Sequence, residues 1–248
     1  MAKPAGTIQV RGTLGDLSFY DSVFGPIVRR KGGPSAKQIA KLPSFERVRE
    51  HNAEFKECAA SGKLLRIALG PLLLAAKDHR LVWRVTQLMS RIKNCDTVSE
   101  RGQRTVATGL GTSEGSSLLK NFDFNSAAPL KKVLLKTPVV NASAGSISLK
   151  GLITADHLKA PKGTTHILLK AAGTGLDFTA KQARLYESET QILKLSKKPV
   201  NVVFHCKPTD HAPHVLYLLQ VIFMQGINGS LYPLNNGAFN IVSGVGVE

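Results

Sequence analysis

The sequence predicts an α+β protein in which an N-terminal β-hairpin and a helical part precede an antiparallel β-sandwich of the immunoglobulin-like type. Three patterns lead to this expectation: glycine-punctuated alternation at the start, a helical apolar period over 36–96, and a period of two from about residue 130 onward. The 248 residues are 43% hydrophobic, which is enough for one or two folded cores and excludes an intrinsically disordered chain.

The first element covers residues 7–31, where apolar and polar positions alternate. Gly15-Asp16 and Gly25-Pro26 separate the runs as turn residues, so we expect two or three short antiparallel strands. The element ends with Arg29, Arg30 and Lys31, followed by glycine. This cluster is either an anion-binding hairpin end or an edge strand kept soluble by its charge, and we favour the edge strand.

Residues 36–96 follow a helical pattern. In the first helix Phe45, Val48, Phe55 and Ala59 recur at roughly one-face spacing and are expected to face the core. A second helix is expected from Lys63 onward. The third, at about 80–94, is the most clearly amphipathic, with one apolar face formed by Leu81, Val82, Val85, Leu88, Met89 and Ile92.

The opposite face of the third helix is basic. Within about 80° of arc it carries five residues suited to contacting phosphates, namely Arg80, Arg84, Gln87, Arg91 and Asn94. Such a row could follow a nucleic-acid backbone, whereas most charged stripes are solvated helix faces. Both interpretations stay open at this point.

The net charge of +16 points to an anionic partner, such as nucleic acid, a membrane surface or an acidic protein. Eleven of the twelve arginines lie at or before Arg104. Because arginine offers a bidentate fork, we expect the front of the chain to make the specific anion contacts.

Residues 97–128 are weakly patterned and rich in glycine around Gly109 to Gly115. We therefore expect a basic hairpin and helical domain at 1–105, a linker or loop at 106–129, and a β-sandwich at 130–248. Within the sandwich, Asn228-Gly229 and Asn236-Gly237 are strong hairpin-turn pairs between about seven predicted strands.

One segment concentrates groups that can bind a metal: His205, Asp210, His211 and His214. Their spacing matches no established zinc pattern, and two prolines favour an ordinary loop. We therefore expect no metal or other cofactor, and keep a metal-dependent enzyme only as a second alternative.

Motifs for catalysis are scarce. Ser61-Gly62-Lys63 lacks the Ser or Thr that a phosphate-binding loop requires after its lysine, and the glycines from Gly109 to Gly115 follow no convincing strand. The three cysteines are far apart and odd in number, which argues against a disulfide framework. We expect the protein not to be an enzyme.

A Gly-x-Leu-Gly-x-Leu-x-Phe-Tyr hairpin lies at Gly12 to Tyr20, and an Arg-x-Lys-Gly-Gly element lies at Arg29 to Gly33. Further matching residues follow in the helical part and beyond it, at Arg49, Asn52, Glu54, Phe55, Gly62, Lys63, Arg66 and Asn121 to Asn125. In these motifs the first half of the chain resembles a group of uncharacterised Bacteroidota proteins, although Arg49 is one position closer to Asn52 than in their pattern. The resemblance implies a bacterial or phage-related intracellular origin and brings no activity, cofactor or functional residue.

We therefore expect a non-enzymatic binding or assembly protein that uses the sandwich as an interface and an arginine-rich helical part to contact an anionic partner. A protein partner or self-assembly is expected, and backbone-directed nucleic-acid binding is the first alternative. The N-terminus lacks the apolar stretch of a secretory signal, and the longest apolar run, Leu64 to Ala76, contains Arg66 and falls short of the about 20 residues that span a membrane. We expect a cytoplasmic protein without membrane insertion.

Overall fold

The computed structural model describes residues 10–30, 32–208, 212–234 and 238–248. The chain divides into two compact units, Met1–Arg49 and Glu50–Glu248. Helices and antiparallel sheets confirm the predicted α+β class. The division lies far from the expected boundary near residue 105, because the helices after Glu50 share a core with the sheet that follows them.

The first unit contains a three-stranded antiparallel sheet in the order β1-β2-β3. Its elements are β1 (Gly12–Leu14), β2 (Leu17–Ser22), β3 (Gly25–Arg30), α1 (Ala36–Lys41) and the 3-10 helix η1 (Pro43–Phe45). Gly15, with φ of +54°, forms the turn between β1 and β2. A reciprocal pair of hydrogen bonds between Ser35 and Gln38 caps α1.

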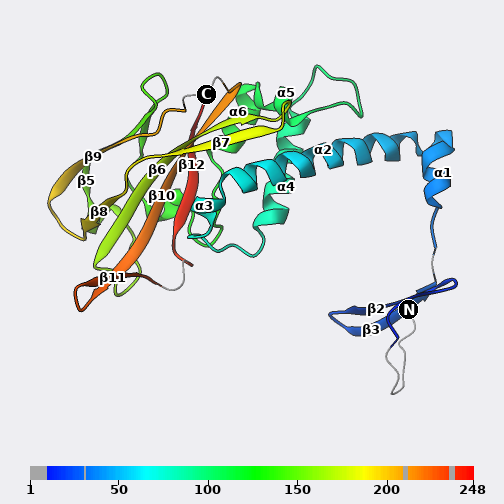
Figure 1. Ribbon diagram of the computed structural model, residues 1–248, viewed down its shortest axis with the longest axis horizontal. Coiled ribbons are helices and arrows are strands. Elements are labelled where there is room, and N and C mark those ends of the chain that lie inside the picture. The colour runs from blue at the N-terminus through cyan, green and yellow to red at the C-terminus, as the bar shows by residue number, and fades with distance from the viewer. Residues whose placement is uncertain (1–9, 31, 209–211, 235–237) are drawn as a thin grey trace. The chain divides into compact units, whose positions relative to one another are not determined.

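The second unit begins within α2 (Glu46–Ala68) and holds the remaining helices and strands (Figure 1). The helices are α3 (Gly70–Leu73), α4 (Leu81–Asn94), α5 (Val106–Leu110), α6 (Ser113–Lys120), α7 (Leu130–Val133) and α8 (Thr154–His157). The strands are β4 (Val139–Asn141), β5 (Ser146–Ile153), β6 (His166–Asp177), β7 (Gln182–Glu187), β8 (Gln191–Lys194), β9 (Pro199–His205), β10 (His214–Ile227), β11 (Ser230–Pro233) and β12 (Ile241–Val247).

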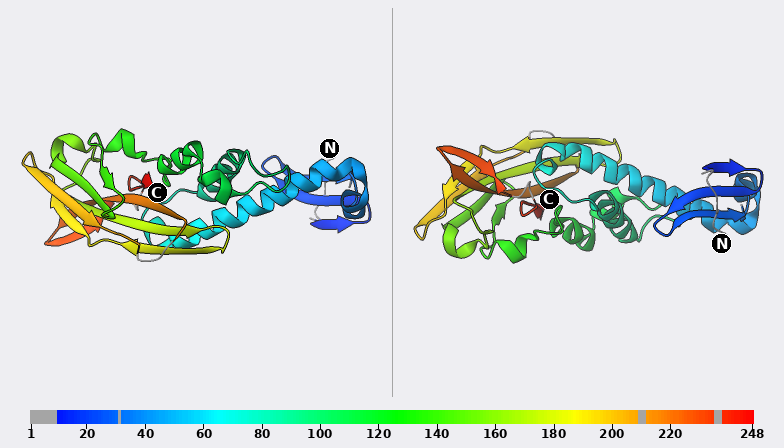
Figure 2. Two further views of the ribbon diagram at one scale, coloured as in Figure 1. Left: turned by 90° about the horizontal axis from the view of Figure 1, so that it is seen from above. Right: turned by 90° about the horizontal axis from the view of Figure 1, so that it is seen from below.

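The strands of this unit form a six-stranded sheet centred on β6 and β10 and a three-stranded sheet in the order β4-β5-β9. Strand residues alternate between two cores. Tyr217 and Leu219 of β10 face the small sheet, while Leu216 and Leu218 face the helices. Two antiparallel sheets thus pack on one core, as the sandwich prediction requires, and helices cover the other face of the large sheet (Figures 1 and 2). That helical layer is not part of an immunoglobulin-like arrangement.

Much of the segment expected to be a linker at 106–129 instead forms the packed helices α5 and α6. Val106, Leu110, Leu119 and Phe124 are fully buried. Its glycines permit close contact between backbones, since a Cβ atom at Gly109 would lie 2.0 Å from the carbonyl oxygen of Ile92. The glycine content that indicated a loop therefore reflects close helix packing.

The predicted hairpin turn at Asn228-Gly229 is confirmed. Both residues have positive φ values, +49° and +82°, and they join β10 to β11 as a two-residue loop. The other predicted turn, Asn236-Gly237, lies outside the described residues.

Candidate functional site

Helix α2 is held in the second unit by a stripe of small and apolar side chains. Cys58, Ser61, Gly62 and Leu65 are buried. Gly62 allows α4 to approach, because a Cβ atom there would lie 3.3 Å from Val85 Cγ1. The expected core face of this helix was wrong: the side chains of Phe55 and Val48 are 61% and 39% exposed.

A buried ion pair lies beside this stripe. Lys93 Nζ on α4 donates to Glu54 Oε2 at 2.6 Å, and the N–H of Gly102 donates to Glu54 Oε1 at 2.9 Å. Burial raises the pKa of Glu54, but the hydrogen bond from Lys93 and that from Gly102 outweigh it and leave the pKa below its ordinary value. The pair therefore fixes the register of α2 against α4.

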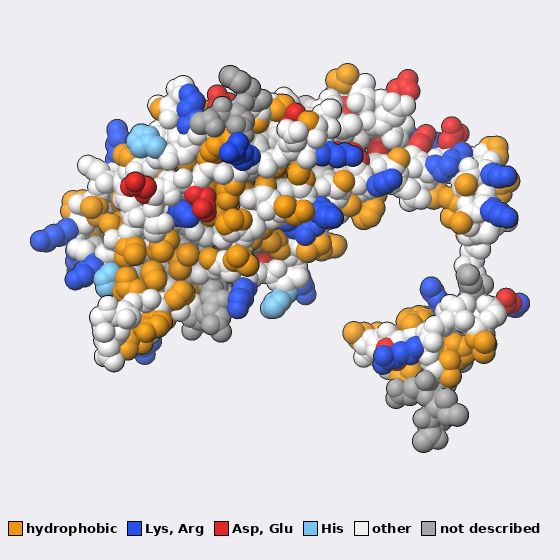
Figure 3. Space-filling model, in the orientation of Figure 1, with side chains coloured by type: hydrophobic (Ala, Val, Ile, Leu, Met, Phe, Trp, Pro, Cys, Tyr) orange, Lys and Arg blue, Asp and Glu red, His pale blue; other side chains and the backbone are white. Residues whose placement is uncertain are grey.

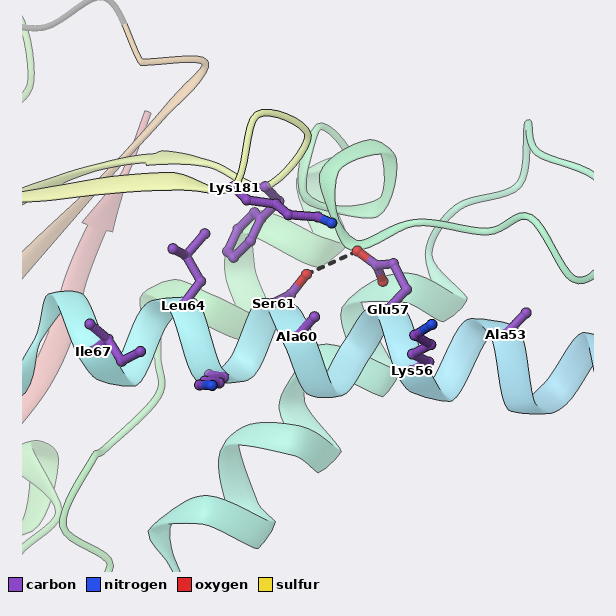
Figure 4. Close-up of a pocket in the computed structure, with 10 residues that line it drawn as sticks. Ala53, Lys56, Glu57, Ala60, Ser61, Leu64, Ile67 and Lys181 are labelled. Carbon is purple, nitrogen blue, oxygen red and sulfur yellow. Dashed lines mark hydrogen bonds between the residues drawn. The ribbon is translucent and has the colours of Figure 1, made fainter.

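A groove runs along the adjacent stripe of α2. Its floor is Ala53, Glu57, Ala60, Leu64 and Ile67, a 4-3-4-3 spacing that places all five on one side of the helix. Phe178 and Lys181, at and beyond the end of β6, form the facing wall of a cavity of about 440 Å³. Figure 4 shows the Lys181 side chain reaching over α2 toward Glu57.

The rim of the groove is basic. Lys56, Lys63 and Lys181 line it, and within the described part of the chain none of them forms an ion pair. The one acidic lining residue, Glu57, is already occupied: it accepts from Ser61 Oγ at 2.9 Å and from the N–H of Val106 at 3.3 Å. Figure 3 shows basic and hydrophobic side chains next to each other along α2. A floor that is apolar apart from the engaged Glu57, with unpaired cations on its rim, suits an anionic amphipathic partner.

Arg84, the second residue of the predicted basic stripe, makes its contacts inside the fold. It donates to Asp78 Oδ2 and to the carbonyl oxygen of Asp123, both at 2.7 Å, and its guanidinium lies 4.9 Å from the ring centre of Phe122. Its side chain is 20% exposed, so it is not available to a phosphate backbone. Because Arg84 pairs with Asp78, 6 positions earlier in the sequence, it does not belong to the exposed basic face.

The other four members of the stripe are exposed: Arg80 immediately before α4, and Gln87, Arg91 and Asn94 on it. None of their side chains hydrogen-bonds or pairs with another described residue. The predicted phosphate-binding face is therefore reduced to two arginines and two amides.

The second predicted anion cluster lies on β3, an edge strand of the first unit. Arg30 pairs with Asp16 at 3.2 Å, and Arg29 lies 5.5 Å from the ring centre of Tyr20. Both arginines are exposed, so these contacts add little stability. Lys31 lies outside the described residues.

Two of the four predicted metal residues lie in the described part of the chain. His205 is exposed on β9 and His214 is half-buried on β10, while Asp210 and His211 fall in a segment the structure does not describe. Among the described residues no three His, Cys, Asp or Glu side chains converge as metal ligands would.

Reactive thiols are also scarce around the cores. Burial raises the pKa of Cys58 and of Cys206 to about 11, which suppresses the thiolate that a nucleophile needs.

No helix in the described part of the chain has the length and apolar content to cross a membrane.

No protein-family model, curated protein or solved structure matches this chain.

The sequence analysis did not predict the groove, although the pattern that forms its floor is visible in the sequence. The 4-3-4-3 spacing from Ala53 to Ile67 is visible in the residues themselves. The facing wall was not, because Phe178 and Lys181 come from a turn more than a hundred positions away.

Proposed function

We propose that this is a non-enzymatic binding or assembly protein whose α2 groove receives an amphipathic helix with acidic flanks from a protein partner. The observation that carries the proposal is the partly exposed floor of the α2 groove, which is bordered by three lysines that form no ion pair in the described structure. A helix laid in a groove places apolar side chains in the floor at the same 3–4 spacing, with charged residues on both sides.

The floor of the α2 groove exposes apolar side chains that a partner helix could bury. Ile67 is 65% exposed, Ala60 is exposed, and Leu64 is half-buried against the core. Full burial of an Ile or Leu side chain contributes about 1.5–3 kcal/mol. Small residues at Ala53 and Ala60 let a second helix approach closely, which supports a helix as the occupant.

Charge favours an acidic partner over a second copy of this chain. The groove lining has three lysines and one occupied carboxylate, and the whole chain carries +16. A second copy would bring like charges together, which opposes association, whereas acidic flanks gain both attraction and a faster encounter.

A designed peptide tests the proposal. The probe is a helical peptide with leucine at its core positions and glutamate at its flanks, and the matched peptide carries lysine in place of each glutamate. Fluorescence anisotropy should detect binding of the glutamate peptide, loss of that binding with A60E or I67E, and no loss with the control V98E, whose side chain is 85% exposed outside the groove.

Three outcomes would contradict the proposal. Equal affinity for both peptides would remove the role of the lysines, and unchanged binding by A60E and I67E would remove the groove. A dimer of the protein alone that A60E dissociates would show that a second copy occupies the groove.

A second candidate function is backbone-directed nucleic-acid binding, which the exposed face of α4 favours. Arg80 and Arg91 remain free on that face with Gln87 and Asn94. R80A and R91A should each weaken binding uniformly across sequences and lower the salt slope by about one. Anisotropy with labelled duplexes over a salt series measures both effects, and identical slopes for wild type and both variants would exclude this function.

A further inference from the structure

A second cavity, of about 290 Å³, lies on another part of the same unit. It is bounded by the end of α6, by α7 with the segment after it, and by β12. Its lining residues are Lys120, Asn121, Asp123, Leu130, Lys131, Leu134, Lys136, Thr137, Pro138, Val140, Ser243, Gly244 and Val245.

The floor of this cavity is fixed by backbone hydrogen bonds. The N–H of Gly244 donates to the carbonyl oxygen of Phe122 at 3.0 Å, and the N–H of Phe124 donates to that of Val242 at 2.8 Å. Gly244 also has no room for a side chain, since a Cβ atom would lie 2.6 Å from the carbonyl oxygen of Leu119. The cavity is thus preformed between rigid elements.

The charged side chains that line this cavity are mostly positive. Lys120, Lys131 and Lys136 line it from three different segments, and none pairs with an acidic residue or donates a side-chain hydrogen bond within the described structure. The one carboxylate, Asp123, accepts from the N–H of Leu130 at 2.9 Å. Lys136 is only partly exposed, so its charge is less screened by water than that of a surface lysine.

The walls between the lysines are apolar. Leu130, Leu134 and Val245 are buried, and Val140 and Pro138 are half-buried beside them. The lining of this cavity therefore combines hydrocarbon walls with three lysines. This combination is typical of sites for small amphipathic anions.

We propose that this cavity binds a small organic phosphate monoester, an apolar or aromatic body that carries one dianionic phosphate. Three lysines provide compact charges for a dianion, and lysine is a common phosphate ligand. The α2 groove is lined by none of these residues, so this site stands independently of the proposed partner helix.

Phenyl phosphate is the probe, with benzyl alcohol as the neutral body and inorganic phosphate as the charged end alone. In methyl-detected NMR spectra, millimolar phenyl phosphate should shift Leu134, Val140 and Val245, and both controls should bind at least about tenfold more weakly. The double variant K131Q/K136Q should weaken phenyl phosphate at least about tenfold. K150Q, at an exposed lysine on β5 that lines neither cavity, is the matched control and should leave the affinity unchanged.

The proposal would be overturned if these methyl groups stay unshifted, if benzyl alcohol shifts them with equal affinity, or if K150Q and K131Q/K136Q behave alike. All substituted lysines but Lys136 are exposed, so the methyl spectrum of each free variant should match wild type away from the substitution. Should K131Q/K136Q not fold, K131Q alone provides the same comparison at an exposed position.

Discussion

Glu54 and Lys93, 39 positions apart in the sequence, meet at 2.6 Å with side chains only 6% and 8% exposed. This pair ties α2 to α4 and so positions the helix that forms the floor of the groove. A buried ion pair contributes little over well-packed apolar residues, but loss of one partner leaves an uncompensated charge inside the protein.

Removal of one partner should therefore be costly. E54A or K93A should lower the free energy of unfolding by about 3–5 kcal/mol, because the remaining charge stays buried. The double variant E54L/K93M should recover most of that loss. Urea unfolding followed by circular dichroism measures all three, and a double variant as unstable as the sum of the singles would contradict the account.

Acid should weaken the protein through Asp96. Burial raises the pKa of this carboxyl, but hydrogen bonds from the N–H groups of Ser99 and Thr105 outweigh it and hold the pKa at about 2. Because the pKa is lower in the folded state than the ordinary value near 3.8, the stabilisation is present above that ordinary value and is lost as the pH falls toward 2.

The variant D96N should be less stable at neutral pH and should lose stability less steeply between about pH 5 and pH 2. D156N, at an exposed aspartate, is the control and should follow the wild-type curve. Urea midpoints measured across this pH range give the comparison. Parallel curves for wild type and D96N would show that Asp96 does not supply this dependence.

Close packing at the glycines of α5 and α6 should be intolerant of a methyl group. A Cβ atom at Gly109 would lie 2.0 Å from the Ile92 carbonyl oxygen, and one at Gly115 would lie 2.0 Å from that of Gly109. G109A and G115A should each lower stability by about 1–3 kcal/mol or more. G70A, with no atom within 4 Å of the added Cβ, should be neutral or stabilising in thermal unfolding.

Where the sequence has a strong local pattern, its predictions agree with the structure. Val85, Leu88, Met89 and Ile92 form the buried face of α4, as the 3.6-residue period indicates, although Val82 is 56% exposed. The turn between β10 and β11 was also predicted correctly, from Asn228-Gly229.

Where contacts between distant residues decide the outcome, the sequence predictions fail. The buried face of α2 includes a glutamate and leaves Phe55 exposed, because Lys93 on another helix neutralises Glu54. The sequence predicted Arg84 on a phosphate-binding face, but its guanidinium donates to the carboxylate of Asp78 and to the carbonyl oxygen of Asp123. No local period encodes these long-range partners.

The central claim is that a partner helix with acidic flanks binds in the α2 groove. The most direct measurement is a methyl-detected NMR titration with the glutamate-flanked peptide. The account predicts shifts at Ala53, Ala60, Leu64 and Ile67, with Val98 and Val203, which are exposed elsewhere in the unit, unchanged. Shifts confined to other surfaces, or no shift at these four residues while the peptide binds, would contradict it.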